Sequence, residues 1–177
     1  KIVVKWYEPL TIIFLRLIIS GSLMMVFMLL TRSWQTIKRK HLKYFLLLAF
    51  SQPFCYFLGE SFGLKLVSST IASVIIATIP LFSPFAGYFL VREKVTLPVV
   101  FGIVFSFFGI ILMLINPDFS LNASPKGVLL LFLAVFAAVA YSVIIRKISH
   151  EYNPVTIITH QNLIGAVYFL PLFLVFD

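Results

Sequence analysis

The heptapeptide Tyr7-Glu-Pro-Leu-Thr-Ile-Ile13 recurs 145 positions later as Tyr152-Asn-Pro-Val-Thr-Ile-Ile158. Each copy opens an apolar stretch long enough to cross a bilayer, which takes about 20 residues. Matching isoleucines are common in so apolar a chain, but matching Tyr, Pro and Thr residues are not. The two copies therefore indicate an internal repeat built from membrane-spanning helices.

The composition excludes a soluble protein. Of the 177 residues, 61% are hydrophobic and only 11% are charged, and a soluble domain needs a more polar surface than this. The apolar runs are continuous rather than alternating, so they predict helices and not a β-barrel. The net charge of +8 comes from cations clustered between these runs. We therefore expect the lipid bilayer as a partner and no nucleic acid.

Six stretches are predicted to span the membrane: Pro9–Leu30, Leu42–Leu64, Thr70–Val91, Leu97–Ile115, Gly127–Ile145 and Pro154–Phe176. Cytoplasmic connections are enriched in Lys and Arg. If the first span runs inward, nine cations lie on the inner side: Arg32, Lys38, Arg39, Lys40, Lys43, Arg92, Lys94, Arg146 and Lys147. Four lie outside: Lys1, Lys5, Lys65 and Lys126. This bias predicts a multi-pass protein of the cell (inner) membrane with residues 31–41, 92–96 and 146–153 in the cytoplasm.

The two copies are separated by five crossings, an odd number, so they are expected to run through the membrane in opposite directions. Inverted repeats of this kind are typical of secondary transporters. By the same offset, one further span is expected before Lys1 and three after Asp177. The predicted fold is an all-α membrane helix bundle with six of ten spans of a 5+5 inverted repeat. Residues 1–121 would form a first repeat lacking its first span, and residues 122–177 would begin the second.

Several stretches resemble the EamA-type family of the drug/metabolite transporter superfamily. Pro9-Leu-Thr followed by Phe14-Leu-Arg16 resembles the start of that family's second helix, and Gly63-Leu-Lys65-Leu-Val-Ser-Ser69 the end of its third. Ala72-Ser73 through Ile79-Pro80-Leu-Phe to Arg92-Glu93-Lys94-Val95 resembles its fourth helix, and Gly102 with Gly109-Ile-Ile-Leu its fifth. The resemblance implies a permease or efflux carrier of small metabolites, amino acids or drugs.

Charged and polar side chains inside the spans are the candidate substrate or coupling residues. A charge at membrane depth costs about 3 kcal/mol or more, so it usually faces a cavity or a partner. Arg16 and Glu60 both lie in the outer half and form a plausible pair; the alternatives are a structural ion pair or an Arg16 that reaches the outer headgroups. Gln52, Tyr56 and Glu60 recur every four residues and predict one helical stripe, either a packed polar seam or a cavity lining.

The sixth span carries His160, Gln161 and Asn162, and Gln161 is the repeat mate of Arg16. His160 is a candidate for binding a proton, although a lone intramembrane His is more often a hydrogen-bond donor between helices. These residues are candidates for binding a small polar or amphipathic metabolite, or a proton.

Pro80 and Pro84 predict a broken third span near the midplane, which would be a static kink or a hinge. The small residues Gly59, Gly63, Gly102, Ser106 and Gly109 are predicted to allow close helix packing.

The sequence favours a carrier working by alternating access over two alternatives. An intramembrane enzyme lacks support, because neither His-Glu-x-x-His nor Gly-x-Ser-x-Gly occurs. A non-transporting or channel-like subunit remains open, as does a homodimer. No catalytic residue, cofactor or metal is expected.

Overall fold

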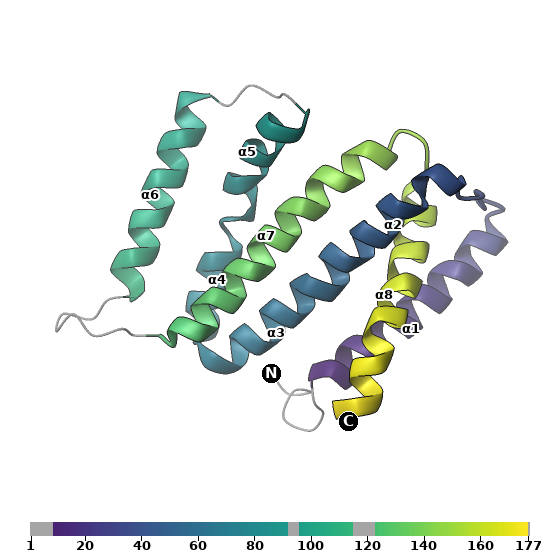
Figure 1. The fold of residues 1–177 in the computed structure, drawn as a ribbon, viewed down its shortest axis with the longest axis horizontal. Coiled ribbons are helices and arrows are strands. Elements are labelled where there is room, and N and C mark those ends of the chain that lie inside the picture. Colours follow the sequence, from purple (N-terminus) through teal and green to yellow (C-terminus); the bar gives the residue numbers. More distant parts are fainter. Residues whose placement is uncertain (1–8, 92–95, 115–122, 177) are drawn as a thin grey trace. The chain divides into compact units, whose positions relative to one another are not determined.

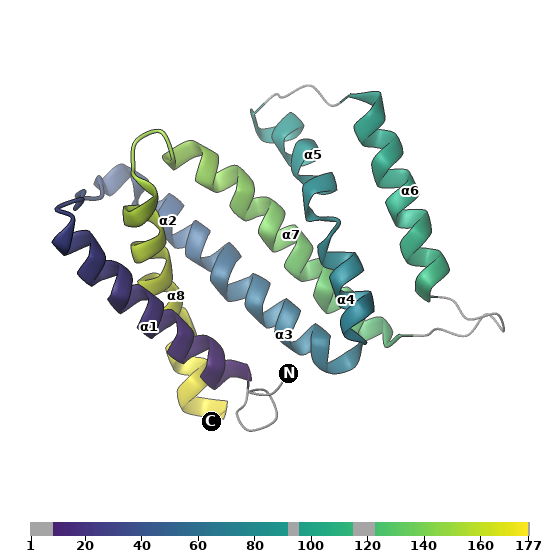
Figure 2. The same ribbon diagram turned by 180° about the vertical axis from the view of Figure 1, so that it is seen from behind.

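The computed structural model describes residues 9–91, 96–114 and 123–176, and every regular element in these ranges is helical. In chain order they are α1 (Pro9–Leu30), the 3₁₀ turn η2 (Arg39–His41), α2 (Leu42–Ala49), the π-type segment η3 (Phe50–Cys55), α3 (Tyr56–Leu66), α4 (Ser69–Ile76), α5 (Ile79–Val91), α6 (Leu97–Leu114), α7 (Pro125–Ile148) and α8 (Pro154–Phe176). Figures 1 and 2 show them from opposite sides.

Membrane length is reached by five helical stretches of the described residues: Pro9–Leu30, Arg39–Leu66, Ser69–Tyr88, Pro125–Ile148 and Pro154–Val175. A shorter apolar helix covers Leu97–Leu112. These stretches correspond to the six predicted spans, and the helices α1 and α8 have the predicted bounds. Large apolar side chains such as Leu23, Phe105 and Leu129 are 65–72% exposed. Helices that are apolar around their whole circumference belong in lipid.

The predicted second span is not one continuous helix. Gln52 has φ −142° and ψ 121°, which is extended backbone between α2 and α3. Because a helical register cannot pass through such a residue, Gln52 does not belong to the stripe predicted for Gln52, Tyr56 and Glu60. That part of the prediction is wrong. Tyr56 and Glu60 remain on one face of α3, and the Tyr56 hydroxyl donates to Glu60 Oε1 at 3.3 Å.

The chain divides into two compact units. The first comprises residues 1–54 and 144–177, and the second residues 55–143. In the first unit α1 packs along α8, and the rings of Phe14 and Phe173 stack with their centroids 4.6 Å apart. Pro9 and Pro154 each open their helix, a position where the missing amide proton of proline costs nothing.

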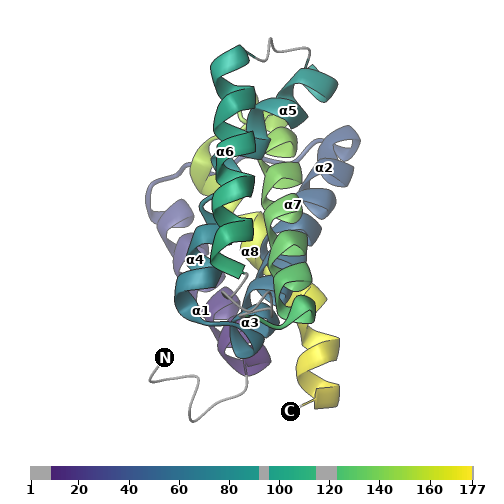
Figure 3. The ribbon, with the colours of Figure 1, turned by 90° about the vertical axis from the view of Figure 1, so that its left-hand side faces the viewer.

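The second unit holds α3 to α6 and most of α7. Its core contains Ile71, Ala72 and Ile75 of α4, Ile110 of α6, and Leu131, Val135 and Val139 of α7. The Ser68 hydroxyl caps α4 by accepting from the Ile71 amide at 3.3 Å. A non-helical step separates α4 from α5 (Figure 2), and Figure 3 shows the same segment from the side, next to α6.

Candidate functional site

The two repeat copies meet directly, because the helices that they open, α1 and α8, lie against each other. Near the end of α1, Met28 contacts Thr156 at the start of α8, with Oγ1 3.7 Å from Sδ. In the middle, Asn162 Nδ2 donates to Ser20 Oγ at 3.1 Å. Near the start of α1, Phe14 stacks on Phe173 of the α8 end. Residue numbers fall along one helix as they rise along the other, so α1 and α8 are antiparallel.

The contacts between these helices also obey the repeat. Adding the offset of 145 to Ser20 gives Gly165, and subtracting it from Asn162 gives Leu17. The second pair also faces across the seam, because a Cβ added to Gly165 would come to 3.5 Å from Leu17 Cδ1. One contact thus maps onto another when the copies are exchanged. This is what a two-fold axis in the membrane plane, crossing the seam between α1 and α8, would produce.

The polar residues predicted on α8 do not converge on one point. Successive residues of a helix point about 100° apart, and His160, Gln161 and Asn162 have different surroundings. His160 Nδ1 donates to the Thr156 carbonyl at 2.8 Å, and its ring contacts Trp34 and Phe45 edge-on. Asn162 points toward α1 and donates a hydrogen bond to Ser20.

Gln161 is the buried member of this group. It is 8% exposed, and its Oε1 has no hydrogen-bond partner among the described residues. An unmet buried acceptor costs about 1–3 kcal/mol. Its repeat mate Arg16 is exposed on α1. Arg16 and Glu60 belong to different compact units, so their pairing stays a prediction.

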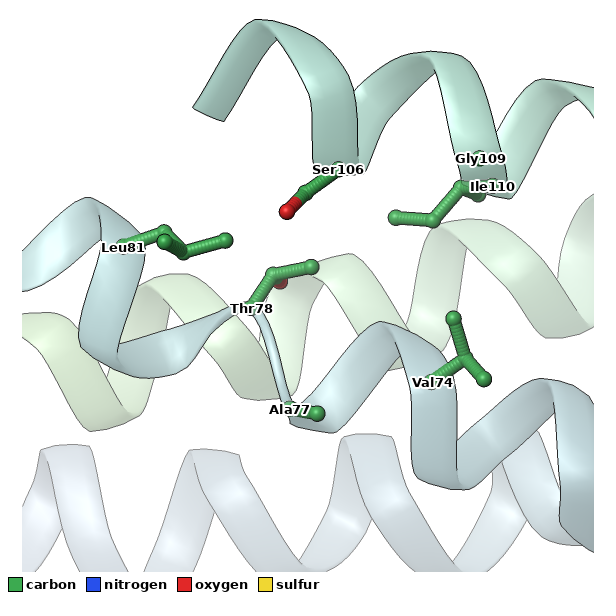
Figure 4. Close-up of a pocket in the computed structure, with 7 residues that line it drawn as sticks. All are labelled: Val74, Ala77, Thr78, Leu81, Ser106, Gly109 and Ile110. Atoms are coloured by element: carbon green, nitrogen blue, oxygen red, sulfur yellow. The ribbon is translucent and has the colours of Figure 1, made fainter. Parts of the chain in front are cut away.

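The step between α4 and α5 opens onto a cavity of about 390 Å³. Figure 4 shows its lining: Val74, Ala77, Thr78, Leu81, Ser106, Gly109 and Ile110. Pro80 lies in the first turn of α5 and Pro84 inside it. The Thr78 hydroxyl donates to the Ile75 carbonyl and the Ser83 hydroxyl to the Ile79 carbonyl. Both hydroxyls therefore bind backbone of their own segment.

The five small residues predicted for packing differ in what they meet. A Cβ on Gly59 would lie 2.5 Å from the Leu130 carbonyl oxygen, and one on Gly63 would lie 2.8 Å from Leu131 Cγ. Both glycines therefore permit close approach of α3 to α7. A Cβ on Gly102 would meet Leu81 Cδ2 at an ordinary 3.7 Å. Gly109 would meet no described atom within 4 Å. Gly109 and Ser106 border the cavity instead, so the described residues show no close helix contact at Gly109.

A polar cluster that the sequence reading missed joins the two connections of the first unit. We call Lys38, His41, Glu151 and Tyr152 the loop cluster. Lys38 Nζ lies 2.7 Å from Glu151 Oε2, and His41 Nε2 lies 3.4 Å from Glu151 Oε1. The Lys38 amide donates to the Tyr152 hydroxyl at 3.1 Å, and His41 Nδ1 lies 3.0 Å from the same oxygen. The only hint of this cluster in the sequence was the Tyr that recurs in both heptapeptides.

Charge pairing in the loop cluster shifts two pKa values. The hydrogen bond from Lys38 lowers the pKa of the Glu151 carboxyl, and the same bond raises the pKa of the Lys38 ammonium. Beside the cluster, the Asn153 carboxamide oxygen accepts from the Thr156 amide at 2.7 Å and caps α8. Its Nδ2 donates to the Ser33 carbonyl at 2.9 Å. These contacts hold residues 33–41 against residues 151–153. No three His, Cys, Asp or Glu side chains of the described ranges gather into a metal site.

Comparison with known proteins identifies the family. The model of the EamA-like transporter family matches residues 1–115 and 125–177. An uncharacterized transporter of Archaeoglobus fulgidus is 27% identical over 97% of this chain and 59% of its own length. Two uncharacterized transporters of Bacillus subtilis, YcxC and YetK, are 27% and 22% identical, over 96% and 88% of this chain and 54% and 48% of their own.

The chain thus spans about half the length of the relatives it matches. No solved structure matches it. With five apolar helices of membrane length in the part of the chain that the structure describes and a family match over nearly all its residues, this multi-pass membrane protein belongs to the EamA-like transporter family.

Proposed function

We propose that this protein works as a secondary transporter, moving small metabolites, amino acids or drugs across the cell membrane by alternating access. The observation that carries the proposal is the antiparallel seam between α1 and α8, in which the Ser20–Asn162 and Leu17–Gly165 contacts are exchanged by the repeat. Two similar halves of opposite orientation can swap conformations, and the swap presents a site between them to each side in turn.

The contacts described across the seam are neutral, which suits such a swap. Ser20–Asn162 is a single neutral hydrogen bond, worth about 1 kcal/mol net. Thr156 Oγ1 also contacts Met28 Sδ, and Phe14 packs on Phe173. Gly21 allows α8 to approach α1 closely, since a Cβ on Gly21 would lie 3.0 Å from Leu163 Cδ2. Small residues at a helix interface permit this close packing.

The proposed topology places residues 31–41 and 146–153 in the cytoplasm of a cell with an inner membrane. The loop cluster supports this, because Lys38 and Glu151 can only touch if both connections lie at the same membrane face. In the same scheme residues 1–121 form most of one repeat and residues 122–177 begin the other. Residues 92–95 and 115–122, which this scheme also uses, lie outside the described residues.

Oxidative cross-linking coupled to counterflow tests the proposal. In a background without Cys55, the pair Ser20→Cys with Asn162→Cys should cross-link in proteoliposomes. Each single-cysteine variant should not. The vesicles are preloaded with unlabelled amino acids or ethidium, and entry of the labelled compounds is followed. We expect a transient accumulation that the cross-link abolishes and dithiothreitol restores.

A graded variant accompanies the cross-link. Removing one hydrogen bond of about 1 kcal/mol by Ser20→Ala should change the exchange rate about fivefold. Ser22→Ala, on the exposed face of the same helix, is the matched control and should stay within twofold of the parent. Flux without counterflow would indicate a channel, and no flux of any probe would indicate a structural subunit. Either result contradicts the carrier.

A further inference from the structure

The cavity at the α4–α5 step has a chemistry of its own that neither the family match nor the relatives assign. We infer that it binds a small amphipathic molecule made of an apolar body and one hydrogen-bond donor such as a hydroxyl, amine or indole N–H. The inference deepens the proposed function, on which it rests for the step from binding to transport.

The break in the helix leaves a backbone acceptor without its helical donors on a residue that lines the cavity. Ala77 lines the cavity, and its carbonyl would normally accept from the amide three or four residues later. Pro80, three residues later, has no N–H. The amide of Leu81, four residues later, donates to the Thr78 carbonyl at 2.9 Å instead. The Ala77 carbonyl has therefore lost both of its helical donors.

The side chains around the cavity favour a ligand that has an apolar body and one hydrogen-bond donor. Figure 4 shows the Ser106 hydroxyl projecting from α6 toward the α4–α5 step. The Thr78 hydroxyl is already engaged with the Ile75 carbonyl. The remaining wall is apolar, formed by Val74, Leu81 and Ile110 among others. None of the described residues that line the cavity is charged, so among them an ion would have no counter-charge, which is strongly unfavourable.

Size and depth fit a small ligand. The volume of about 390 Å³ lies at the lower end of the range of about 300–1,000 Å³ that is usual for small-molecule sites. Thr78 is about 14 Å from Ser69 and about 20 Å from Val91 along the helix, from a rise of 1.5 Å per residue. The site is therefore near the middle of a span of roughly 30 Å. In so apolar a setting, a ligand N–H or O–H gains most from meeting an acceptor that has lost its helical donors.

Gly109 gives the space that the ligand would use. An added Cβ there meets no described atom within 4 Å, so a larger side chain would enter the cavity rather than strain a helix contact. Gly109→Leu is accordingly the cavity-filling variant, and Gly109→Ala is its small counterpart. Phe105→Leu is the matched control on α6, since Phe105 is 72% exposed and does not line the cavity.

Photolabelling tests the site on the intact chain in lipid nanodiscs. The probe is benzyl alcohol carrying a trifluoromethyl-diazirine group, with insertion sites read by mass spectrometry. Competition uses 2-naphthylmethanol, and its methyl ether serves as the analogue without a donor. We expect saturable labelling of the α4 and α6 peptides that the alcohol suppresses at least fivefold more potently than the ether. Ser106→Ala should weaken the alcohol about two- to tenfold, the range expected for one hydrogen bond.

The variants decide between a site and mere partitioning into lipid. Gly109→Leu should abolish the saturable labelling, while Gly109→Ala and Phe105→Leu should keep it. The inference is overturned if labelling never saturates, or if the alcohol and the ether suppress it equally. Both results are measured on the parent chain, so they do not depend on whether a variant folds. Saturable binding without counterflow would support the inferred binding site and contradict the proposed transporter function. Counterflow without saturable binding would support the transporter function and contradict the binding site.

Discussion

Replacing Gly59 by Ala probes the closeness of α3 and α7 through a single added methyl group. A Cβ at this position would lie 2.5 Å from the Leu130 carbonyl oxygen and 3.0 Å from the Ala134 amide nitrogen. Both are backbone atoms of α7, so no side-chain rotation can relieve the overlap. Overpacking of this kind costs about 1–3 kcal/mol. It is partly offset by about 1 kcal/mol, the gain in helix propensity of Ala over Gly.

The matched control is Gly109→Ala on α6, where the new Cβ meets no described atom within 4 Å. That variant has the propensity gain without the overlap. The two substitutions should therefore differ in stability by about 1–3 kcal/mol, with Gly59→Ala the less stable. In chains of this length each kcal/mol moves the melting temperature by about 2–4 °C.

Thermal unfolding in detergent, followed by size-exclusion chromatography of the surviving fraction, measures the difference. We expect Gly59→Ala to melt about 2–12 °C below Gly109→Ala. Gly59→Leu should fall further still, because a longer side chain meets the same backbone. Equal melting temperatures for the two alanine variants would show that α3 and α7 do not approach as closely as the glycine contacts indicate.

Three further predictions concern the helix cap, the loop cluster and the topology. Asn153→Ala removes both the cap of α8 and the bond to the Ser33 carbonyl, and it should lower the stability of the first unit by about 1 kcal/mol or more. Asn153→Asp keeps the capping oxygen but loses the donor to Ser33, so in the same melting assay it should lie between the parent and Asn153→Ala. The lowered pKa of Glu151 and the raised pKa of Lys38 keep the loop cluster paired across the neutral range. The pairing is lost when the pH falls from the ordinary carboxyl value of 4.5 through the lowered pKa of Glu151, or rises from 10.5 through the raised pKa of Lys38. At pH 7, Glu151→Gln mimics the protonated carboxyl, so the Lys38 amide should exchange its hydrogen faster than in the parent chain. An unchanged exchange rate would show that the loop cluster does not hold the two connections together. In intact cells an impermeant maleimide should label a cysteine at Lys126 and spare one at Arg39, and the reverse would invert the proposed topology.

Much of the helix pattern could be predicted because it depends on local properties. The bounds Pro9–Leu30 and Pro154–Phe176 agree with the structure, since an apolar run and a proline at its first position act within one helix. The opposite direction of the repeats was predicted from the odd number of crossings, and the antiparallel packing of α1 and α8 agrees with it. In both cases counting along the chain was enough.

Tertiary structure alone decided what each polar or small residue faces. Gly59 and Gly109 look alike in sequence, yet one lies against a neighbouring helix and the other borders a cavity. The extended backbone of Gln52 removed it from a stripe that a regular period predicted. Tyr152 marked the repeat in the sequence, but only folding brought it to Lys38 and His41. Periodicity specifies the direction in which a side chain leaves its own helix, whereas its neighbours come from distant parts of the chain, whose approach depends on packing.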